Sequence, residues 1–192
     1  MSFDPRNYKS IFHIKNSQSY THFEKLNVQD AIGQLILNFV TNVPKGVLCF
    51  FTSYKQMDML CERWKKVQIW SQMTEHKQIF FEPRKGDESL QAMMSKYYSA
   101  VDSGKGALML AVVRGKVSEG LSFSDDYARA VIMVGIPYPN VKDPKIVLKK
   151  EYNMVNKKKL SGSEFVFQKS SIISSIAQPK KIGGTPCKLF VL

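Results

Sequence analysis

The sequence predicts an α/β fold in which a mostly parallel sheet carries helices on both faces. Four short apolar runs alternate with segments whose apolar residues recur at helical spacing, and such alternation is typical of parallel sheets. The runs at 47–51 and 107–113 are apolar at every position, as expected for strands buried on both faces. With 192 residues, 44% of them hydrophobic, the chain can bury one ordinary core.

The first part of the chain predicts two helices around the first strand. In "DAIGQLILNFVTNV", residues 30–43, the apolar residues have helical spacing, and Asp30 is placed to cap the helix. "PKG" at 44–46 ends this helix before the strand at 47–51. A second helix is expected in "TSYKQMDMLCERWKK", where Ser53 and Gln56 form a capping box. Its apolar face consists of Tyr54, Met57, Cys61 and Trp64.

The second part predicts a strand at 78–83 that ends at Pro83, followed by a third helix. The apolar face of that helix consists of Leu90, Met93, Met94, Tyr97, Tyr98 and Val101. Strands at 107–113 and 130–137 flank the stretch "RGKVSEGLSFSDD", and Asp143 with Pro144 begins a further helix. Beyond residue 153 the pattern ends, although "FVFQ" could add a strand. We expect one domain over residues 1–153, incomplete at its C-terminus, and an irregular tail over 154–192.

Charge and composition narrow the class of protein. The formal net charge of +12 favours a polyanionic partner, although a generally basic surface would give the same total. The three cysteines form no CxxC pair and the three histidines show no ligand spacing, so neither a disulfide framework nor a metal site is expected. No apolar run approaches the roughly 20 residues of a membrane-spanning helix. These features predict a soluble intracellular protein without a membrane partner.

Two loops could carry chemistry, because ligands of parallel sheets bind at the carboxyl ends of the strands. The first is "TSYK" after 47–51, and the second is the stretch at 114–126. In the second loop, glycines would let backbone N–H groups approach an anion, basic groups would add charge, and Glu119 could accept hydrogen bonds from a ribose or position a water. The glycine spacing matches neither a Walker A nor a Rossmann motif, so a long turn with ordinary surface charges is equally compatible. Asp125, Asp126 and Arg129 suit a charged turn before the next strand.

Several segments, in order, resemble the second RecA-like motor domain of XPD-like superfamily 2 DNA helicases. They are "HIKNSQ", "GVLCFFTSYKQMDML", "FFEPR" and "AVVRGKVSEGLSFSDDYARAVIMVGIPYPNVKDPKIVLKKEYN". The resemblance covers roughly residues 12–153 and is nearest to FANCJ-type members, with telomere-length-regulating relatives next. It implies a RecA-like sheet, ATP with Mg²⁺ held between two motor domains, and movement along single-stranded DNA.

The resemblance also assigns candidate site residues, none of them catalytic and none binding a metal. The part of the chain containing Ser53 and Tyr54 resembles motif IV, and 114–126 resembles motif V. The implied nucleotide-binding residues are Gly115, Lys116, Ser118, Glu119, Gly120 and Ser122. The implied DNA-binding residues are Ser53, Tyr54, Lys55 and Arg114. Hydroxyls, glycine amides and basic groups suit a groove that tracks a nucleic-acid backbone without reading its sequence.

The sequence departs from the family pattern in ways that limit what this chain could do alone. Ser122 stands where "EGLDF" or "EGIDF" has an aspartate, so a charged hydrogen-bond acceptor is lost. The 192 residues contain no GxxxxGK[ST] segment, no DEAH-type pair, no "QAxGRxxR" motif VI and no set of four cysteines. An iron–sulfur cluster is therefore not expected, and we expect a fragment, a truncated splice product or a degenerate copy that does not hydrolyse ATP alone.

The resemblance implies a nuclear protein of DNA repair, with single-stranded DNA and a first motor domain or helicase partner as its ligands. A non-enzymatic module that binds nucleic acid or docks on a helicase is the alternative. An unrelated doubly wound enzyme that uses the same loop for a small phosphorylated substrate is a third possibility.

Overall fold

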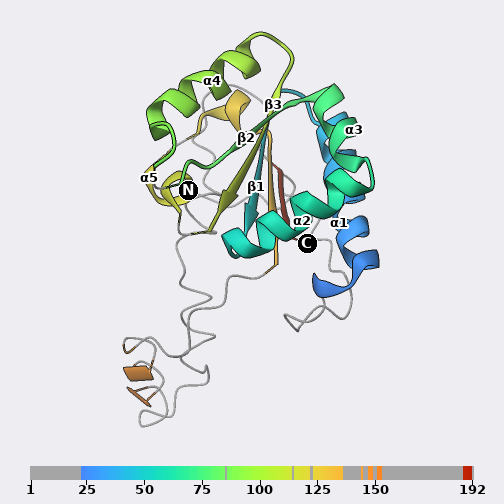
Figure 1. The fold of residues 1–192 in the computed structure, drawn as a ribbon. Helices are drawn as coiled ribbons and strands as arrows, with labels where there is room; N and C mark the ends of the chain where they lie inside the picture. Colours follow the sequence, from blue (N-terminus) through green and yellow to red (C-terminus); the bar gives the residue numbers. More distant parts are fainter. Residues whose placement is uncertain are drawn as a thin grey trace.

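The computed structural model describes residues 23–84, 86–113, 115–121, 123–135, 144, 147–148, 151–152 and 188–191. These residues form a parallel sheet with helices packed on both sides (Figure 1). The strands are β1 (Gly46–Phe51), β2 (Gln78–Phe81), β3 (Ala107–Val112), β4 (Ala130–Val134) and β5 (Lys188–Val191). They lie in the order β2-β3-β1-β4-β5, and every neighbouring pair is parallel. The α/β class and the mostly parallel sheet are confirmed.

The central strands are buried on both faces, as their unbroken apolar sequences predict. Every residue of β1, β3 and β4 is buried. Because side chains alternate along a strand, Val47, Cys49 and Phe51 enter the core on one face, whereas Leu48 and Phe50 enter the core on the other. Each strand therefore contributes to two apolar cores, and the sheet between them has no solvated face at its centre.

The helices divide between the two cores. The helices α1 (Leu26–Asn42), α2 (Tyr54–Lys66) and α3 (Ile69–His76) cover one face, and α4 (Leu90–Asp102) with the short α5 (Lys116–Gly120) covers the other (Figure 1). Trp64 of α2 is fully buried in the first core, and Tyr97 of α4 is fully buried in the second. The helical spacing of apolar residues thus identified the correct packing face of α2 and of α4.

The start of the first helix differs from the sequence prediction. Helix α1 begins at Leu26 with Lys25 in the capping position, so Asp30 lies inside the helix and does not cap it. Asp30 instead accepts two hydrogen bonds from Arg63 of α2, both of 2.7 Å. The bonds from Arg63 lower the pKa of the Asp30 carboxyl below its ordinary value. The sequence does not distinguish the two roles, because an aspartate near a helix start can serve either as a cap or as the partner of a basic residue on another helix.

Three elements were not predicted. Helix α3 follows α2 after a break at Gln68, whose φ of 63° is left-handed although the residue is not glycine. Helix α5 lies within the stretch expected to be a loop. Strand β5 lies in the segment expected to be an irregular tail, and it pairs with β4 from Ala130↔Lys188 to Met133↔Val191. A pairing between segments so far apart in sequence leaves no local signal.

Other expectations fall on residues that the structure does not describe. These include "FVFQ", the capping role of Asp143, and the end of the strand expected at 130–137. Of the helix expected after Asp143, residues 144, 147, 148, 151 and 152 are described, and all are helical and exposed. The division at residue 153 stays a prediction. Among the described residues, no helix combines the length and apolar character needed to cross a bilayer.

The contact between α1 and Trp64 generates a test of the first core. Gly33 is buried, and a Cβ there would lie 2.5 Å from Trp64 Nε1, whose N–H donates to Gln29 O at 2.8 Å. Alanine is favoured over glycine inside a helix by about 1 kcal/mol, but overpacking costs about 1–3 kcal/mol. We expect Gly33→Ala to lower the free energy of unfolding in urea by about 1 kcal/mol.

Gln34→Ala, at an exposed position of the same helix, is the matched control and should change stability by less than about 0.5 kcal/mol. A Gly33→Ala variant more stable than the natural chain would show that the indole does not pack against α1.

Candidate functional site

The two loops predicted to carry chemistry meet at one edge of the sheet. Because β1, β2 and β3 are parallel, the segments that follow them emerge at the same edge. Val113 N donates to Phe51 O at 2.9 Å, and Glu82 N donates to Leu110 O at 2.9 Å, which holds the three strand ends in register. We call residues 52–55, 82–84, 113 and 115–120 the carboxyl-edge site.

The first part of this site is the start of α2. Ser53 is the N-cap, and its Oγ accepts a hydrogen bond from Gln56 N at 3.2 Å, as predicted. The reciprocal half of the capping box is different, because Gln56 Oε1 accepts from Thr52 N at 2.9 Å and from Thr52 Oγ1 at 2.8 Å. The buried Gln56 thus fixes the residue before the cap, and the exposed Lys55 projects from the first turn.

Tyr54 lies between this helix start and the segment after β2. The guanidinium of Arg84 lies 4.8 Å from the centre of the Tyr54 ring and also pairs with Asp58 of α2 at 2.5 Å. The Tyr54 hydroxyl donates to Glu82 Oε2 at 3.3 Å. Burial, followed by the negative charge of Glu82, raises the pKa of the Tyr54 hydroxyl above its ordinary value. Tyr54 therefore has a structural role, because its ring packs against Arg84 and its hydroxyl bonds Glu82.

The second part of the site is the turn that contains α5. Gly115 is its N-cap, and Gly115 N donates to Val112 O at 2.9 Å. Val117 anchors the turn, because its side chain is 1% exposed in the second core. Lys116 is exposed, and the Ser118 hydroxyl donates to Gly115 O at 3.1 Å.

The remaining predicted residues are placed less fully. Glu119 and Gly120 complete the helical turn of α5. Arg114 and Ser122 lie outside the described residues. The structure thus brings to one edge of the sheet the predicted DNA-binding residues Ser53 to Lys55 and the predicted nucleotide-binding residues Gly115, Lys116, Ser118, Glu119 and Gly120.

Glu82 is the residue of this site that the sequence reading did not single out. It is 1% exposed, and its carboxylate accepts hydrogen bonds from Val112 N at 2.9 Å and from Val117 N at 2.8 Å, in addition to the Tyr54 hydroxyl. A Cβ on Gly115 would overlap both carboxylate oxygens. The one available signal was an acidic residue between a β-type run and a proline in "FFEPR". Spacing alone could not reveal its distant partners.

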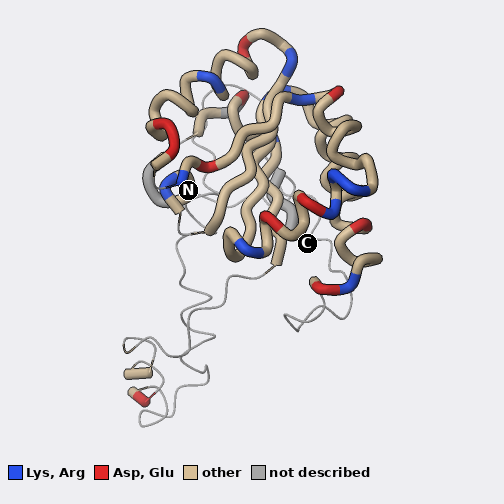
Figure 2. Tube along the Cα trace, viewed as in Figure 1, with Lys and Arg blue, Asp and Glu red and all other residues tan. Residues whose placement is uncertain are grey.

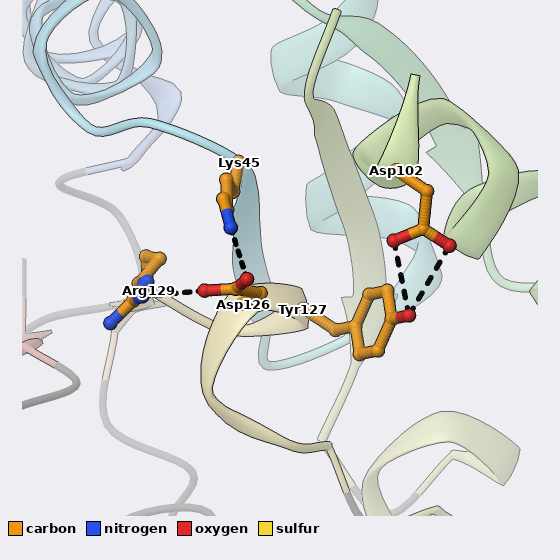
Figure 3. Close-up of polar contacts among 5 residues, drawn as sticks. All are labelled: Lys45, Asp102, Asp126, Tyr127 and Arg129. Atoms are coloured by element: carbon orange, nitrogen blue, oxygen red, sulfur yellow. Dashed lines mark hydrogen bonds and ion pairs between the residues drawn. The ribbon is translucent and has the colours of Figure 1, made fainter. Parts of the chain in front are cut away.

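The end of the 114–129 stretch lies at the opposite, amino edge of the sheet. Asp126 forms ion pairs with Lys45, just before β1, and with Arg129, just before β4 (Figure 3). The hydrogen bond from Lys45 is the main reason that the pKa of Asp126 is lowered. The neighbouring Tyr127 hydroxyl donates to the Asp102 carboxylate at 3.1 Å (Figure 3). These residues form the predicted charged turn and belong to the support of the fold.

A pocket of about 480 Å³ also lies at the amino edge, away from the predicted site. It forms where the carboxyl ends of α1, α3 and α4 meet, and Lys45, Lys77 and Lys105 line it. Helix carboxyl ends carry partial negative charge, so positively charged side chains are favourable near them. Burial lowers the pKa of Lys77 to about 8, and its ammonium donates to Lys45 O at 2.7 Å. The pocket is therefore accounted for by the ends of the helices around it.

The charge of the folded core differs from that of the whole chain. Residues 23–135 contain 14 Lys and Arg against 12 Asp and Glu, so most of the surplus of +12 lies outside this range. In Figure 2 basic and acidic residues are interspersed along the helices and loops, and the sheet between them is largely uncharged. Any attraction of this part of the chain for a polyanion must therefore come from local groups such as Lys55 and Lys116.

The sequence matches a known family over most of this fold. A model of the "Helicase C-terminal domain" family matches residues 36–178, which includes the whole carboxyl-edge site. The chain belongs to the Helicase C-terminal domain family. Together with the relatives below, this match confirms the predicted helicase C-terminal domain.

Curated relatives with high identity are telomere helicases of fruit flies. The chain is 44% identical over 139 residues to the regulator of telomere elongation helicase 1 homolog of Drosophila virilis, which covers 70% of this chain and 14% of that protein. It is 40% identical over 151 residues to the homolog of Drosophila ananassae, which covers 77% of this chain and 15% of that protein. The chain thus spans about one seventh of the length of these relatives.

Solved structures of similar fold are XPD helicases. The fold of this helicase C-terminal domain matches one XPD helicase with a TM-score of 0.61 and 21% identity, over 96% of this chain and 31% of that one. It matches S. tokodaii Xpd4 with a TM-score of 0.52 and 15% identity, over 92% of this chain and 31% of that one. These likenesses support the fold.

Among the described residues, no group of three or more His, Cys, Asp or Glu side chains could hold a metal ion.

Two matched helix caps at this edge allow a test of the local structure. Ser53 Oγ and Ser89 Oγ each accept a hydrogen bond of 3.2 Å from the N–H three residues later, in α2 and α4 respectively. Removing a serine N-cap costs about 1 kcal/mol. We expect Ser53→Ala and Ser89→Ala to lower the free energy of urea unfolding by similar amounts, each about 1 kcal/mol.

The Ser89 variant serves as the stability control for Ser53. A Ser53→Ala variant as stable as the natural chain would show that α2 does not begin at this residue in solution.

Proposed function

We propose that this domain supplies one wall of an ATP cleft and part of a single-stranded DNA groove in an ATP-dependent DNA helicase of genome maintenance, acting in the nucleus. The observation that carries the proposal is the meeting of two motif-bearing segments, 52–55 and 113–120, at the carboxyl edge of one parallel sheet. In open α/β sheets this edge is where ligands bind. Membership of the helicase family and the telomere helicase relatives support the reaction class.

The DNA side of the proposed site is the start of α2. The Ser53 oxygen is used as a cap acceptor, but its O–H remains a donor for a phosphate oxygen. Lys55 is exposed and adds a positive charge in the first turn, two residues after the cap. Backbone N–H groups in the first turn of a helix have no partner within the helix. Such donors bind phosphates without reading bases, which suits a motor that moves along any sequence.

The nucleotide side of the proposed site is the turn at 115–120. ATP would supply the phosphoryl group whose transfer to water drives movement. The exposed Lys116 would balance phosphate charge, while Gly115, Ser118, Glu119 and Gly120 would shape the cleft wall and contact the nucleotide. Arg114 and Ser122 belong to the same proposed surface, on the DNA and nucleotide sides respectively. Mg²⁺ and most charge-stabilising groups would be held by the first motor domain, which we propose as the partner of this one.

A salt series tests the DNA side. Each phosphate contact to single-stranded DNA contributes about 0.7 to the slope of log K against log salt concentration. We expect Lys55→Gln and Arg114→Gln each to weaken binding of a fluorescent oligothymidine and to reduce this slope by about 0.7 in anisotropy titrations. Lys105→Gln removes an exposed lysine at the amino edge and should leave the slope unchanged. Equal slopes for all three variants and the natural chain would contradict the proposed groove.

A phosphate-release assay tests whether this domain needs the first motor domain in order to hydrolyse ATP. The 192 residues contain no GxxxxGK[ST] segment, and catalysis of phosphoryl transfer depends on groups that position the phosphates. We expect the purified chain to release no phosphate from ATP above background in a malachite-green assay, with or without single-stranded DNA. DNA-stimulated release by the chain alone would show that it carries the catalytic groups itself.

A further inference from the structure

We propose that Glu82 is a positioning residue that fixes the DNA-facing and nucleotide-facing parts of the site in one arrangement. The proposal deepens the proposed function and rests on it for the roles of the two parts. Glu82 follows β2, Tyr54 follows β1, and the turn of α5 follows β3. The single carboxylate of Glu82, which follows one strand, therefore touches elements that emerge from two others.

Each oxygen of this carboxylate has a defined partner. Oε1 accepts from Val117 N at 2.8 Å, which is an N–H at the start of α5 that no residue within the helix could bond. Oε2 accepts from Val112 N at 2.9 Å, at the end of β3, and from the Tyr54 hydroxyl at 3.3 Å. One side chain therefore holds the end of β3, the start of α5 and the Tyr54 hydroxyl.

The burial of Glu82 makes these bonds structurally important. A carboxylate with 1% exposure is stable only when its oxygens are bonded, because removal from water is costly. The space above it is closed by Gly115, where a Cβ would overlap both oxygens. The turn therefore packs directly on the carboxylate, and a shift of α5 would break bonds that water cannot replace. Because Tyr54 and the turn share the Glu82 carboxylate as an acceptor, a movement of either would disturb the hydrogen bonds of the other.

Backbone hydrogen bonds at the same edge do not depend on Glu82. Gly115 N still donates to Val112 O, and Val113 N still donates to Phe51 O. Loss of the carboxylate should therefore loosen α5 and Tyr54 while the sheet and α4 stay intact. This separation distinguishes a positioning residue from one that merely supports the fold.

The test compares Glu82→Gln with Glu75→Gln in the full chain. Glutamine keeps the shape of the side chain but replaces one acceptor with an N–H₂ donor, which must then face an N–H. Glu75 is exposed on α3 and receives the same chemical change. Amide hydrogen exchange followed by NMR measures Val117 and Val112 against interior amides of α4. Anisotropy with a fluorescent oligothymidine measures DNA binding.

For Glu82→Gln we expect exchange at Val117 or Val112 to accelerate at least tenfold, with α4 amides changed less than twofold, and affinity for the oligothymidine to fall at least threefold. Glu75→Gln should match the natural chain in both measurements. Unchanged exchange at both valines, or equal acceleration throughout the chain, would overturn the positioning role. Altered exchange with unchanged DNA affinity would also overturn it, provided that the natural chain binds the oligothymidine.

Failure of the natural chain to bind oligothymidine would contradict the proposed function instead, and exchange would still report whether Glu82 holds the turn. Tyr54→Phe provides a second variant if Glu82→Gln does not fold. It removes only the hydroxyl that reaches Glu82, and we expect about a two- to fivefold faster exchange at Val117. Identical exchange at Val117 in Tyr54→Phe and the natural chain would show that the two parts are not coupled.

Discussion

Parallel pairing of strands that are buried on both faces is the constraint on which the rest of this structure depends. Because neighbouring strands are parallel, the chain between them must return to the opposite edge. The helices of these connections cover β1, β3 and β4, which have no solvated face. Parallel direction then sends every strand end to the same edge. Segments that are about 60 residues apart in sequence, such as 52–55 and 113–120, become neighbours for this reason alone.

Buried or paired polar groups fix both edges of the sheet. At the carboxyl edge, Glu82 joins the ends of two strands to the start of α5. At the amino edge, Asp126 joins Lys45 to Arg129, and Arg129 N donates to Gly46 O at 2.8 Å. The stretch at 114–129 thus crosses the molecule from one fixed edge to the other. Its first half carries the exposed Lys116 in α5, whereas its second half supports the fold.

The described core carries too little net charge to attract nucleic acid by its overall charge. Residues 23–135 are close to neutral, so a general electrostatic attraction for phosphates does not come from the described core. In the proposed site, contacts would come instead from a few groups, such as Lys55 toward the DNA and Lys116 toward the nucleotide, at the starts of α2 and α5. Under the proposed function, this domain would bind and release DNA repeatedly, and a small number of oriented contacts is compatible with that requirement.

The sequence by itself determined the α/β class, four of the five described strands, the capping role of Ser53 and the edge at which the two loops meet. These features follow from local patterns in the sequence. Apolar runs that alternate with segments of helical spacing predict a parallel sheet, and a parallel sheet places the loops after its strands at one edge. Only the tertiary structure decided that Asp30 pairs with Arg63, that Lys188–Val191 forms a strand beside β4, and that Glu82 lies beneath Gly115. Each of these depends on a partner at least 30 positions away in the chain. The spacing of residue types along the chain does not show which distant groups the fold will bring within hydrogen-bonding distance.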